Sequence, residues 1–462
     1  MSNFELVVNN GTLLDPESRR ITVANLGIQN GRIAAITRAE IRGEREIDAA
    51  LKIVCPGFID IHAHVDGYGY AAECMVRQGV TTSVGGNCGL GPVELGPFFD
   101  RLDQDGFPLN QAMLIGHSFG LRERVGAVNP RLPATPDQIG RMTALAEQAF
   151  ADGAAGLSFG LEYAPGTSTE EILALSRVAA RYGKLVAVHL RTDSWAGLAA
   201  LREAIGITQA TGAPLQISHL TYQVGMGMMT EALEIIGAAI GSGLDIAADS
   251  GLYHAFATFI GTPVFDEGCV EKWGCEYSDL YAVTGSRAGL RLNRELFLEL
   301  RANDPETVVL AFAGQAVEVL EALEPEYVMV SSDGGIGRPE PGTGHPQDAG
   351  TFPRLFQTAV RECGKISLMD AVRKSTILPA ERLGLKNKGR LRIGADADLV
   401  IFDPQRIADR ANYLGFGVPD ASPEGIDWVV VNGVVVAEAG KLAEGAVPGR
   451  AARAEKRLWR WI

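Results

Sequence analysis

The sequence lacks the features that mark secreted, membrane and nucleic-acid-binding proteins. Its six cysteines include no Cys-x-x-Cys pair, and no apolar run reaches the roughly 18 residues that a membrane-spanning helix needs. The opening MSNFELVVNNG has neither the basic nor the apolar segment of a secretory signal. Lys and Arg number 42 against 56 Asp and Glu, and the resulting charge of −14 disfavours nucleic acid and anionic membranes as partners. We therefore expect a cytoplasmic protein with reduced thiols.

The middle of the chain, from Pro56 to about residue 388, alternates short apolar strands with amphipathic helices. Strands that are apolar almost throughout are typical of parallel sheets covered by helices, and eight of them predict an α/β fold of the (β/α)8 TIM barrel type. The stretch 252–306 is too long for a plain connection and is predicted to be a lid or substrate-binding insertion. The predicted strands are 57–65, 80–89, 109–118, 154–161, 184–191, 214–220, 244–251 and 327–334, and the clearest predicted helices are 135–153, 168–183, 197–212 and 229–243.

Both ends of the chain are rich in β-type segments instead. Asn30-Gly31 between two apolar segments is a strong hairpin signal, and alternating apolar segments return after residue 388. We expect residues 1–55 and 389–462 to form one small β-sandwich domain beside the barrel domain of residues 56–388. The basic, aromatic tail 450–462 is predicted to be a packed strand or helix.

Side chains of metal-ligating types stand at the carboxyl ends of five predicted strands, where the active site of such a barrel lies. Each one alone has an ordinary structural explanation, such as a small core residue for Cys88. Together, a thiol, imidazoles and a carboxylate predict a zinc site. His117 also ends a strand, but we expect it to be a buried polar residue bonded to a backbone carbonyl. The predicted metal-site residues are His62, His64, Cys88, His189, His219 and Asp333.

Several motifs carry a resemblance to a known family. The segments PGFIDIHAHV and SSDG resemble the amidohydrolase superfamily. The segments QGVTTSVGGNCG, GLEYAPGTSTEE, QISHL and GTFPR, together with LPAERLGLKNKGRLRIGADADLVIFDP, are similar to the D-aminoacylase (N-acyl-D-amino-acid deacylase) family. The resemblance runs from residue 4 to about 450 and is weakest over 252–306.

The resemblance implies a zinc-dependent enzyme that cleaves a C–N amide bond of a small molecule. Cys88, His189 and His219 would hold one tight zinc ion, while His62, His64 and Asp333 would form a second, weaker metal position. The strand 154–161 has no lysine, so the carboxylated-lysine bridge of hydantoinases is absent, and Cys88 would take that ligating place. Zinc lowers the pKa of bound water to ~7, and Asp333 would act as general base and then as general acid. The Tyr163 hydroxyl would bind the oxyanion or, equally, pack on the barrel rim.

Two departures from the family leave the substrate open. The family commonly has a lysine and an arginine where this chain has Thr221 and Gln347, and both cations belong to the clamp on the substrate carboxylate. The insertion only partly resembles the family's YPY-type segment, and its best matches are Tyr253, a predicted substrate-binding residue, and Thr258. Arg191 and Arg354 are the nearby cations that could replace the clamp, although pairing with acids such as Asp193 or Asp348 is the favoured interpretation. An uncharged substrate is therefore expected to be turned over better than a simple N-acetyl-D-amino acid.

Three alternatives to an N-acyl-D-amino-acid deacylase stay open at this point. A hydrolase of a neutral or cyclic amide, such as a lactam, imide or hydantoin-like ring, is the strongest. A deaminase on the same barrel is disfavoured, because such sites usually carry His-x-x-Glu and here His219 is followed by Leu-Thr-Tyr. A non-catalytic relative is disfavoured because such relatives lose ligands. The oligomeric state stays open, with a homo-oligomer as one alternative.

Overall fold

Eight parallel strands form the barrel, and each of the eight predicted segments contains one of them. The computed structural model describes residues 4–455. The strands are neighbours in chain order, and a parallel bridge between Ala63 and Gly334 links the first to the last, so that the barrel is nearly closed. They are β6 (Phe58–Asp60), β7 (Val80–Gly85), β8 (Asn110–Gly116), β9 (Gly156–Gly160), β10 (Leu185–His189), β11 (Leu215–Ile217), β12 (Ile246–Ser250) and β16 (Val328–Val330).

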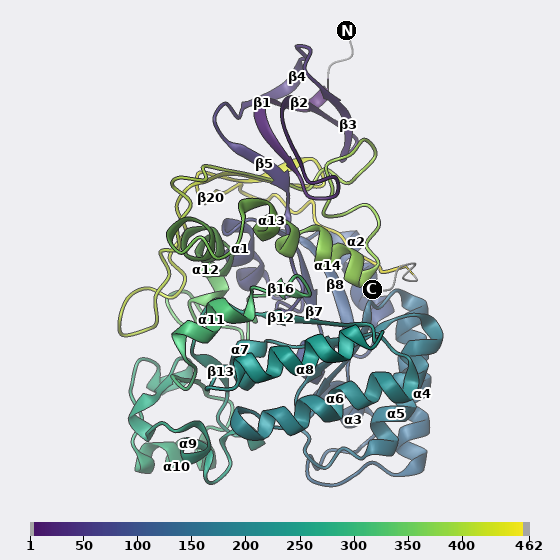
Figure 1. Cartoon of the computed structure of the whole chain (residues 1–462), viewed down its shortest axis with the longest axis vertical. Coiled ribbons are helices and arrows are strands. Elements are labelled where there is room, and N and C mark those ends of the chain that lie inside the picture. The colour runs from purple at the N-terminus through teal and green to yellow at the C-terminus, as the bar shows by residue number, and fades with distance from the viewer. Residues whose placement is uncertain (1–3, 456–462) are drawn as a thin grey trace.

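The four predicted helices are all present around this barrel (Figure 1). Their inward faces are apolar and buried, for example Leu175 and Ala179 of the second one, and this burial holds them on the strands. They are α4 (Pro136–Asp152), α5 (Thr169–Tyr182), α6 (Gly197–Thr211) and α8 (Met229–Gly241), and they are joined by α1 (Gly69–Arg77), α2 (Leu95–Asp105), α7 (Leu220–Val224), α11 (Ala316–Ala322), α12 (Gln347–Arg354), α13 (Leu368–Ser375) and α14 (Ile377–Leu383).

His117 is a buried polar residue, as predicted, but its partner is a carboxylate and not the predicted backbone carbonyl. Its Nε2 lies 2.8 Å from Glu171 Oε1 of α5, and Arg122 Nη1 bonds the same oxygen at 2.7 Å. A buried carboxylate needs such partners, because an unpaired charge in the interior is costly. His117 is therefore part of a structural triad rather than of a metal site.

The insertion between β12 and β16 forms a small unit of its own. Strands β13 (Phe256–Phe259), β15 (Val308–Ala311) and β14 (Leu280–Ala282) make an antiparallel sheet, on which α9 (Cys269–Trp273) and α10 (Arg294–Asn303) pack. Because β15 is the central strand of that sheet, the unit extends beyond the predicted limit of residue 306. It lies at the lower left of Figure 1, beside the barrel.

The two chain ends share one sheet, which confirms the predicted fold class. Strand β5 pairs antiparallel with β17 and so joins the N-terminal strands to the C-terminal ones (purple and yellow in Figure 1). Asn30 and Gly31 both have positive φ, 52° and 70°, as the tight turn between β2 and β3 requires. The strands are β1 (Phe4–Asp15), β2 (Arg20–Gln29), β3 (Arg32–Thr37), β4 (Gly43–Asp48), β5 (Ile53–Pro56), β17 (Leu399–Phe402), β18 (Ile426–Val431), β19 (Val434–Glu438) and β20 (Lys441–Leu442).

Some sequence predictions lie beyond what this structure tests. The domain boundaries at residues 55 and 389 stay predictions, and residues 456–462 of the basic tail lie outside the described residues. Within residues 4–455, none of the helices combines the length and the apolar character that crossing a membrane would require.

Candidate metal centre

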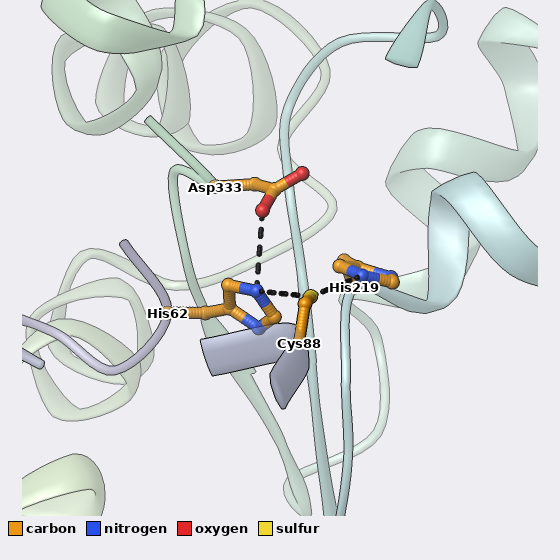
Figure 2. A group of neighbouring side chains, drawn as sticks. All are labelled: His62, Cys88, His219 and Asp333. Carbon is orange, nitrogen blue, oxygen red and sulfur yellow. Dashed lines mark hydrogen bonds and ion pairs between the residues drawn. The ribbon is translucent and has the colours of Figure 1, made fainter. Parts of the chain in front are cut away.

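Four buried side chains meet at the carboxyl ends of the barrel strands (Figure 2). The Cys88 sulfur lies 3.3 Å from Nε2 of His62 and 3.3 Å from Nε2 of His219. Asp333 Oδ1 lies 3.1 Å from Nε2 of His62. The candidate ligand atoms of these four residues all lie within 4.8 Å of one another. A thiol, two imidazoles and a carboxylate at this spacing form a donor set for a single ion or a close pair of ions.

The other two predicted ligands adjoin this group. His64 Nε2 lies 3.1 Å from the same Asp333 oxygen, and the His189 ring stands edge-on to His219 with 4.7 Å between ring centroids. The structure therefore brings all six predicted residues together. Cys88 lies between members of both predicted ligand sets, because His219 is on one side of its sulfur and His62 is on the other.

The backbone is left-handed at three of these positions. Cys88, His219 and Asp333 have φ values of 53°, 33° and 60°, in a region that residues with a side chain rarely adopt. Such a conformation costs about 1–3 kcal/mol per residue and persists only where the surrounding structure imposes it. The strain turns each side chain toward a common centre just past its strand, as is typical of functional sites.

The charges of the cluster depend on its imidazoles. Burial opposes ionisation of the Cys88 thiol, yet His62 and His219 hold its pKa well below the ordinary value. Burial also opposes ionisation of Asp333, but hydrogen bonds with His62 and His64 keep its pKa well below the usual carboxyl range. The site thus favours a thiolate and a carboxylate side by side, which is the charge arrangement that a divalent cation stabilises.

Several imidazole nitrogen atoms near the cluster have no hydrogen-bond partner. In residues 4–455, Nδ1 of His64, His189 and His219 is buried and has no hydrogen-bond partner. Buried polar atoms normally have a hydrogen-bond partner, so several unpartnered nitrogen atoms close together are unusual. Because His64 and His219 turn Nε2 toward Asp333 and Cys88, their Nδ1 atoms would reach an ion only after a ring flip. The sulfur and nitrogen atoms that already face the cluster fit zinc-type metals.

Two aspartates that the sequence analysis missed hold the ligands in place. Asp249 accepts hydrogen bonds from the His219 backbone N–H at 2.9 Å and from Ser331 Oγ at 2.9 Å, and it faces His62 Nδ1 at 3.3 Å. Asp60 accepts from the backbone N–H of Ser332 at 3.0 Å. Both carboxylates are fully buried inside apolar strands, and a charged residue in such a strand is the signal that could have identified them.

A second missed group is an ion cluster beside His189. Lys272 of α9 reaches from the insertion to Glu162 Oε1 at 3.0 Å and to Asp193 Oδ1 at 2.6 Å. Glu162 in turn lies 3.2 Å from His189 Nε2, and Trp273 Nε1 donates to Asp193 at 2.8 Å. The insertion is therefore fastened to the barrel next to a proposed ligand. This contact could not be predicted from the sequence, because Lys272 lies where the family resemblance is weakest.

Tyr163 and Glu162 line a small pocket next to His189 and Asp333. The Tyr163 hydroxyl shares a hydrogen bond of 2.9 Å with Thr258 Oγ1, and its ring lies 4.7 Å from that of His189. The tyrosine predicted to bind the oxyanion therefore stands beside the cluster with its hydroxyl inside the pocket. Thr258, which the insertion supplies, fixes its orientation.

The predicted substrate-binding residues lie outside this pocket. Thr221 and Gln347 are fully buried, and they bond Ser250 Oγ at 2.6 Å and the Asp333 carbonyl at 2.7 Å. Arg191 pairs with Glu203 at 2.7 Å, and Tyr253 donates to Asp409 at 2.7 Å.

Arg191 and Arg354, the two candidate cations, both pair with acidic residues, as the favoured interpretation predicted. The acidic residues are not the ones that were predicted. Arg191 pairs with Glu203 rather than Asp193. Arg354 lies 3.3 Å from Asp409 rather than Asp348, and it stacks on the Tyr253 ring. Neither cation is free to bind a substrate carboxylate in this arrangement.

The barrel and its buried thiolate, imidazole and carboxylate groups define a metal-dependent hydrolase. Residues 45–273 and 331–437 match the amidohydrolase family, and the chain belongs to this family. The chain is 32% identical to a D-aminoacylase and 30% identical to an N-acyl-D-glutamate deacylase, both from Alcaligenes xylosoxydans xylosoxydans. Each alignment covers 94% of this chain and at least 93% of the relative. The protein is therefore a hydrolase of amide C–N bonds, and the predicted resemblance is confirmed.

Solved structures agree over nearly the whole chain. The crystal structure of a D-aminoacylase matches with a TM-score of 0.84 at 31% identity, and the match covers 97% of this chain and 99% of that one. An N-acyl-D-glutamate deacylase from Bordetella bronchiseptica, solved with zinc and a phosphonate inhibitor, matches with a TM-score of 0.87 at 28% identity over 98% and 100% of the two chains. A D-hydantoinase from Thermus, at 18% identity and a TM-score of 0.66, shares the fold alone.

Proposed function

We propose that the protein is a zinc-dependent deacylase of N-acyl-D-amino acids. The observation that carries this proposal is the position of the Cys88 sulfur, 3.3 Å from two imidazoles in a fully buried cluster. The names of the relatives that align along the whole chain support the substrate class. The zinc in the Bordetella bronchiseptica structure supports the choice of metal.

The ligand roles follow from the donor atoms. Cys88, His189 and His219 would hold the tighter ion, because thiolate and imidazole are the donors that zinc prefers. His62, His64 and Asp333 would form the second, weaker position. When it is bound at this centre, zinc polarises the scissile carbonyl and lowers the pKa of a water molecule to ~7. Asp249 would keep His62 oriented through the 3.3 Å contact with its Nδ1.

Asp333 is positioned to transfer the proton. Its Oδ1 is engaged by both His62 and His64 at 3.1 Å, which leaves Oδ2 to accept a proton from the attacking water. The same atom would then return that proton to the amide nitrogen as the C–N bond breaks, because an amide nitrogen is a poor leaving group unless it is protonated. The Tyr163 hydroxyl would donate to the developing oxyanion from the pocket wall.

A neutral amide is the second candidate substrate, and the charges around the pocket favour it. Thr221 and Gln347 bring no charge, and Lys272, Arg191 and Arg354 are each paired with carboxylates. A free substrate carboxylate therefore needs one of these pairs to open, since an unpaired buried charge is unfavourable.

A hydrolysis screen tests both candidates. The purified protein is loaded with zinc and offered N-acyl-D-amino acids, their L-enantiomers and the corresponding C-terminal amides. Amine release from the D-acids that chelation abolishes and zinc restores would support the deacylase. Preferential release of the amino-acid amide from the neutral substrates would support the second candidate, whereas ammonia release from them would show that the terminal carboxamide is cleaved instead of the N-acyl bond.

A further inference from the structure

Two spaces adjoin the metal cluster, and they differ in size. The pocket beside His189 has a volume of about 20 Å³, which is enough for about one water molecule. His64, another member of the cluster, lines a separate cavity of about 810 Å³, within the range of cavities that hold small-molecule ligands. A substrate amide at the cluster can therefore extend a large group only toward the His64 side.

The cavity begins at the ligands themselves. Asp66, Leu90 and Gly335 line it, and each stands two residues after a proposed ligand, namely His64, Cys88 and Asp333. The inner wall is thus built from the loops that follow β6, β7 and β16. A group bound in this cavity would lie beside His64.

Glycine keeps the passage next to His64 open. Gly335 has a φ of 91°, and a Cβ at this position would come within 2.9 Å of the His64 carbonyl oxygen. A side chain there would be strained and would crowd the loop that carries a ligand. The wall beside the cluster is therefore bare backbone.

The deeper wall is apolar. The charged residues in the lining, Arg101, Asp105, Glu306 and Arg338, are exposed, and Asp66 accepts a hydrogen bond from the Gly86 N–H at 2.9 Å. Charge therefore lies mainly at the rim, whereas the interior offers hydrocarbon and aromatic contacts. The apolar wall residues are Leu90, Phe98, Leu102, Phe107, Phe259 and Ile336.

We propose that this cavity binds the acyl chain of the substrate and that the enzyme prefers a medium-length aliphatic acyl group over acetyl. This inference rests on the proposed deacylase function. The polar amino-acid part would face Glu162, Gln223 and Lys272, where hydrogen-bonding groups gather, and the ion pairs of Lys272 would have to open so that the 20 Å³ pocket enlarges to admit it. Each methylene that enters the apolar cavity should raise kcat/KM about fourfold, as expected from the transfer of a buried CH₂ out of water.

The test uses zinc-loaded, full-length protein and one D-amino acid carrying acetyl, butyryl, hexanoyl or octanoyl. We expect kcat/KM to rise along this series. Leu102→Trp, on α2, narrows the cavity and should lower the octanoyl-to-acetyl ratio of kcat/KM at least tenfold. Gln104→Trp is the matched control, because this exposed residue lies on the same helix outside the cavity wall, and it should leave the ratio unchanged. Phe259→Trp, at the part of the wall that β13 supplies, provides a second narrowing variant if Leu102→Trp does not fold.

The outcomes separate the two proposals. Equal or falling kcat/KM from acetyl to octanoyl, or a ratio unaffected by both narrowing variants, would overturn the acyl-chain assignment and leave the deacylase intact. Failure to hydrolyse any N-acyl-D-amino acid at any chain length would overturn the proposed function and this inference with it.

Discussion

The strand ends of the barrel and the insertion that packs beside them contribute different things to the site. The strand ends supply every proposed ligand, from Cys88 to Asp333, and buried carboxylates such as Asp249 support them. The insertion supplies Lys272 and Thr258, which contact pocket residues. The groups that carry the chemistry therefore belong to the barrel, whereas the insertion shapes the space around them. The insertion is also where the sequence departs most from the family.

The largest effect should come from the thiolate at the centre of the cluster. Cys88→Ala removes the softest donor and should lower both the zinc content and kcat/KM, the latter by at least a thousandfold, since metal activation of water accounts for much of the rate. Metal analysis and kinetics on the same preparation measure both. Cys363→Ala, which alters an exposed cysteine, is the control, and full zinc with full turnover in Cys88→Ala would refute the ligand assignment.

The second largest loss of activity should come from removing the group that transfers the proton. Asp333→Asn keeps the shape of the side chain but removes the base, so kcat should fall by about 10²–10⁴-fold. The tight ion, held by the other ligands, should remain largely bound. A variant that loses both zinc and activity in parallel with Cys88→Ala would show that Asp333 acts mainly as a ligand.

The two predicted metal positions should respond differently to ligand removal. His62→Ala should reduce activity while retaining more of the tightly bound zinc than Cys88→Ala does, because His62 belongs to the weaker position. Zinc retained after dialysis against a chelator series distinguishes the two variants. Equal losses would mean that the two positions are not separate.

A substitution at Lys272 removes the ion pairs that hold the insertion against the barrel. Lys272→Met leaves Glu162 and Asp193 without their cation, and burial together with the Glu162 charge already raises the pKa of Asp193 to about 7. Because Lys272 is partly exposed, we expect a loss of about 2 kcal/mol in the free energy of unfolding, less than for a fully buried pair. Arg287→Met breaks an exposed pair in the same insertion and should cost less than about 1 kcal/mol. Denaturant unfolding compares the two, and equal effects would argue against the fastening role.

The smallest effect concerns the substrate carboxylate. Thr221→Lys combined with Gln347→Arg should shift the preference from amides toward acids by about tenfold, equivalent to about 1.4 kcal/mol. Gln347→Met is the neutral control. Because both positions are buried, thermal unfolding must first show that the double variant is folded. An unchanged acid-to-amide ratio in a folded double variant would show that these positions do not face the substrate.

The sequence allowed the barrel and the six candidate ligands to be predicted because both depend on local patterns. Apolar strands alternate with helices, and the ligands stand at strand ends, so that the fold itself brings His62 and His219 together. The Lys272 bridge could not be predicted, since it joins residues about eighty to a hundred and ten positions apart through packing of a variable insertion. The left-handed backbone at Cys88 could not be predicted either, because nothing in the residues around a cysteine requires a positive φ.

X-ray absorption at the zinc edge tests the central claim most directly, because it reports the atoms bound to the metal independently of activity. In the zinc-loaded wild type we expect one sulfur at about 2.3 Å together with nitrogen and oxygen donors at about 2.0 Å. In Cys88→Ser the sulfur shell should disappear. A shell of nitrogen and oxygen alone in the wild type, or a sulfur shell that survives in Cys88→Ser, would contradict a metal centre built around Cys88.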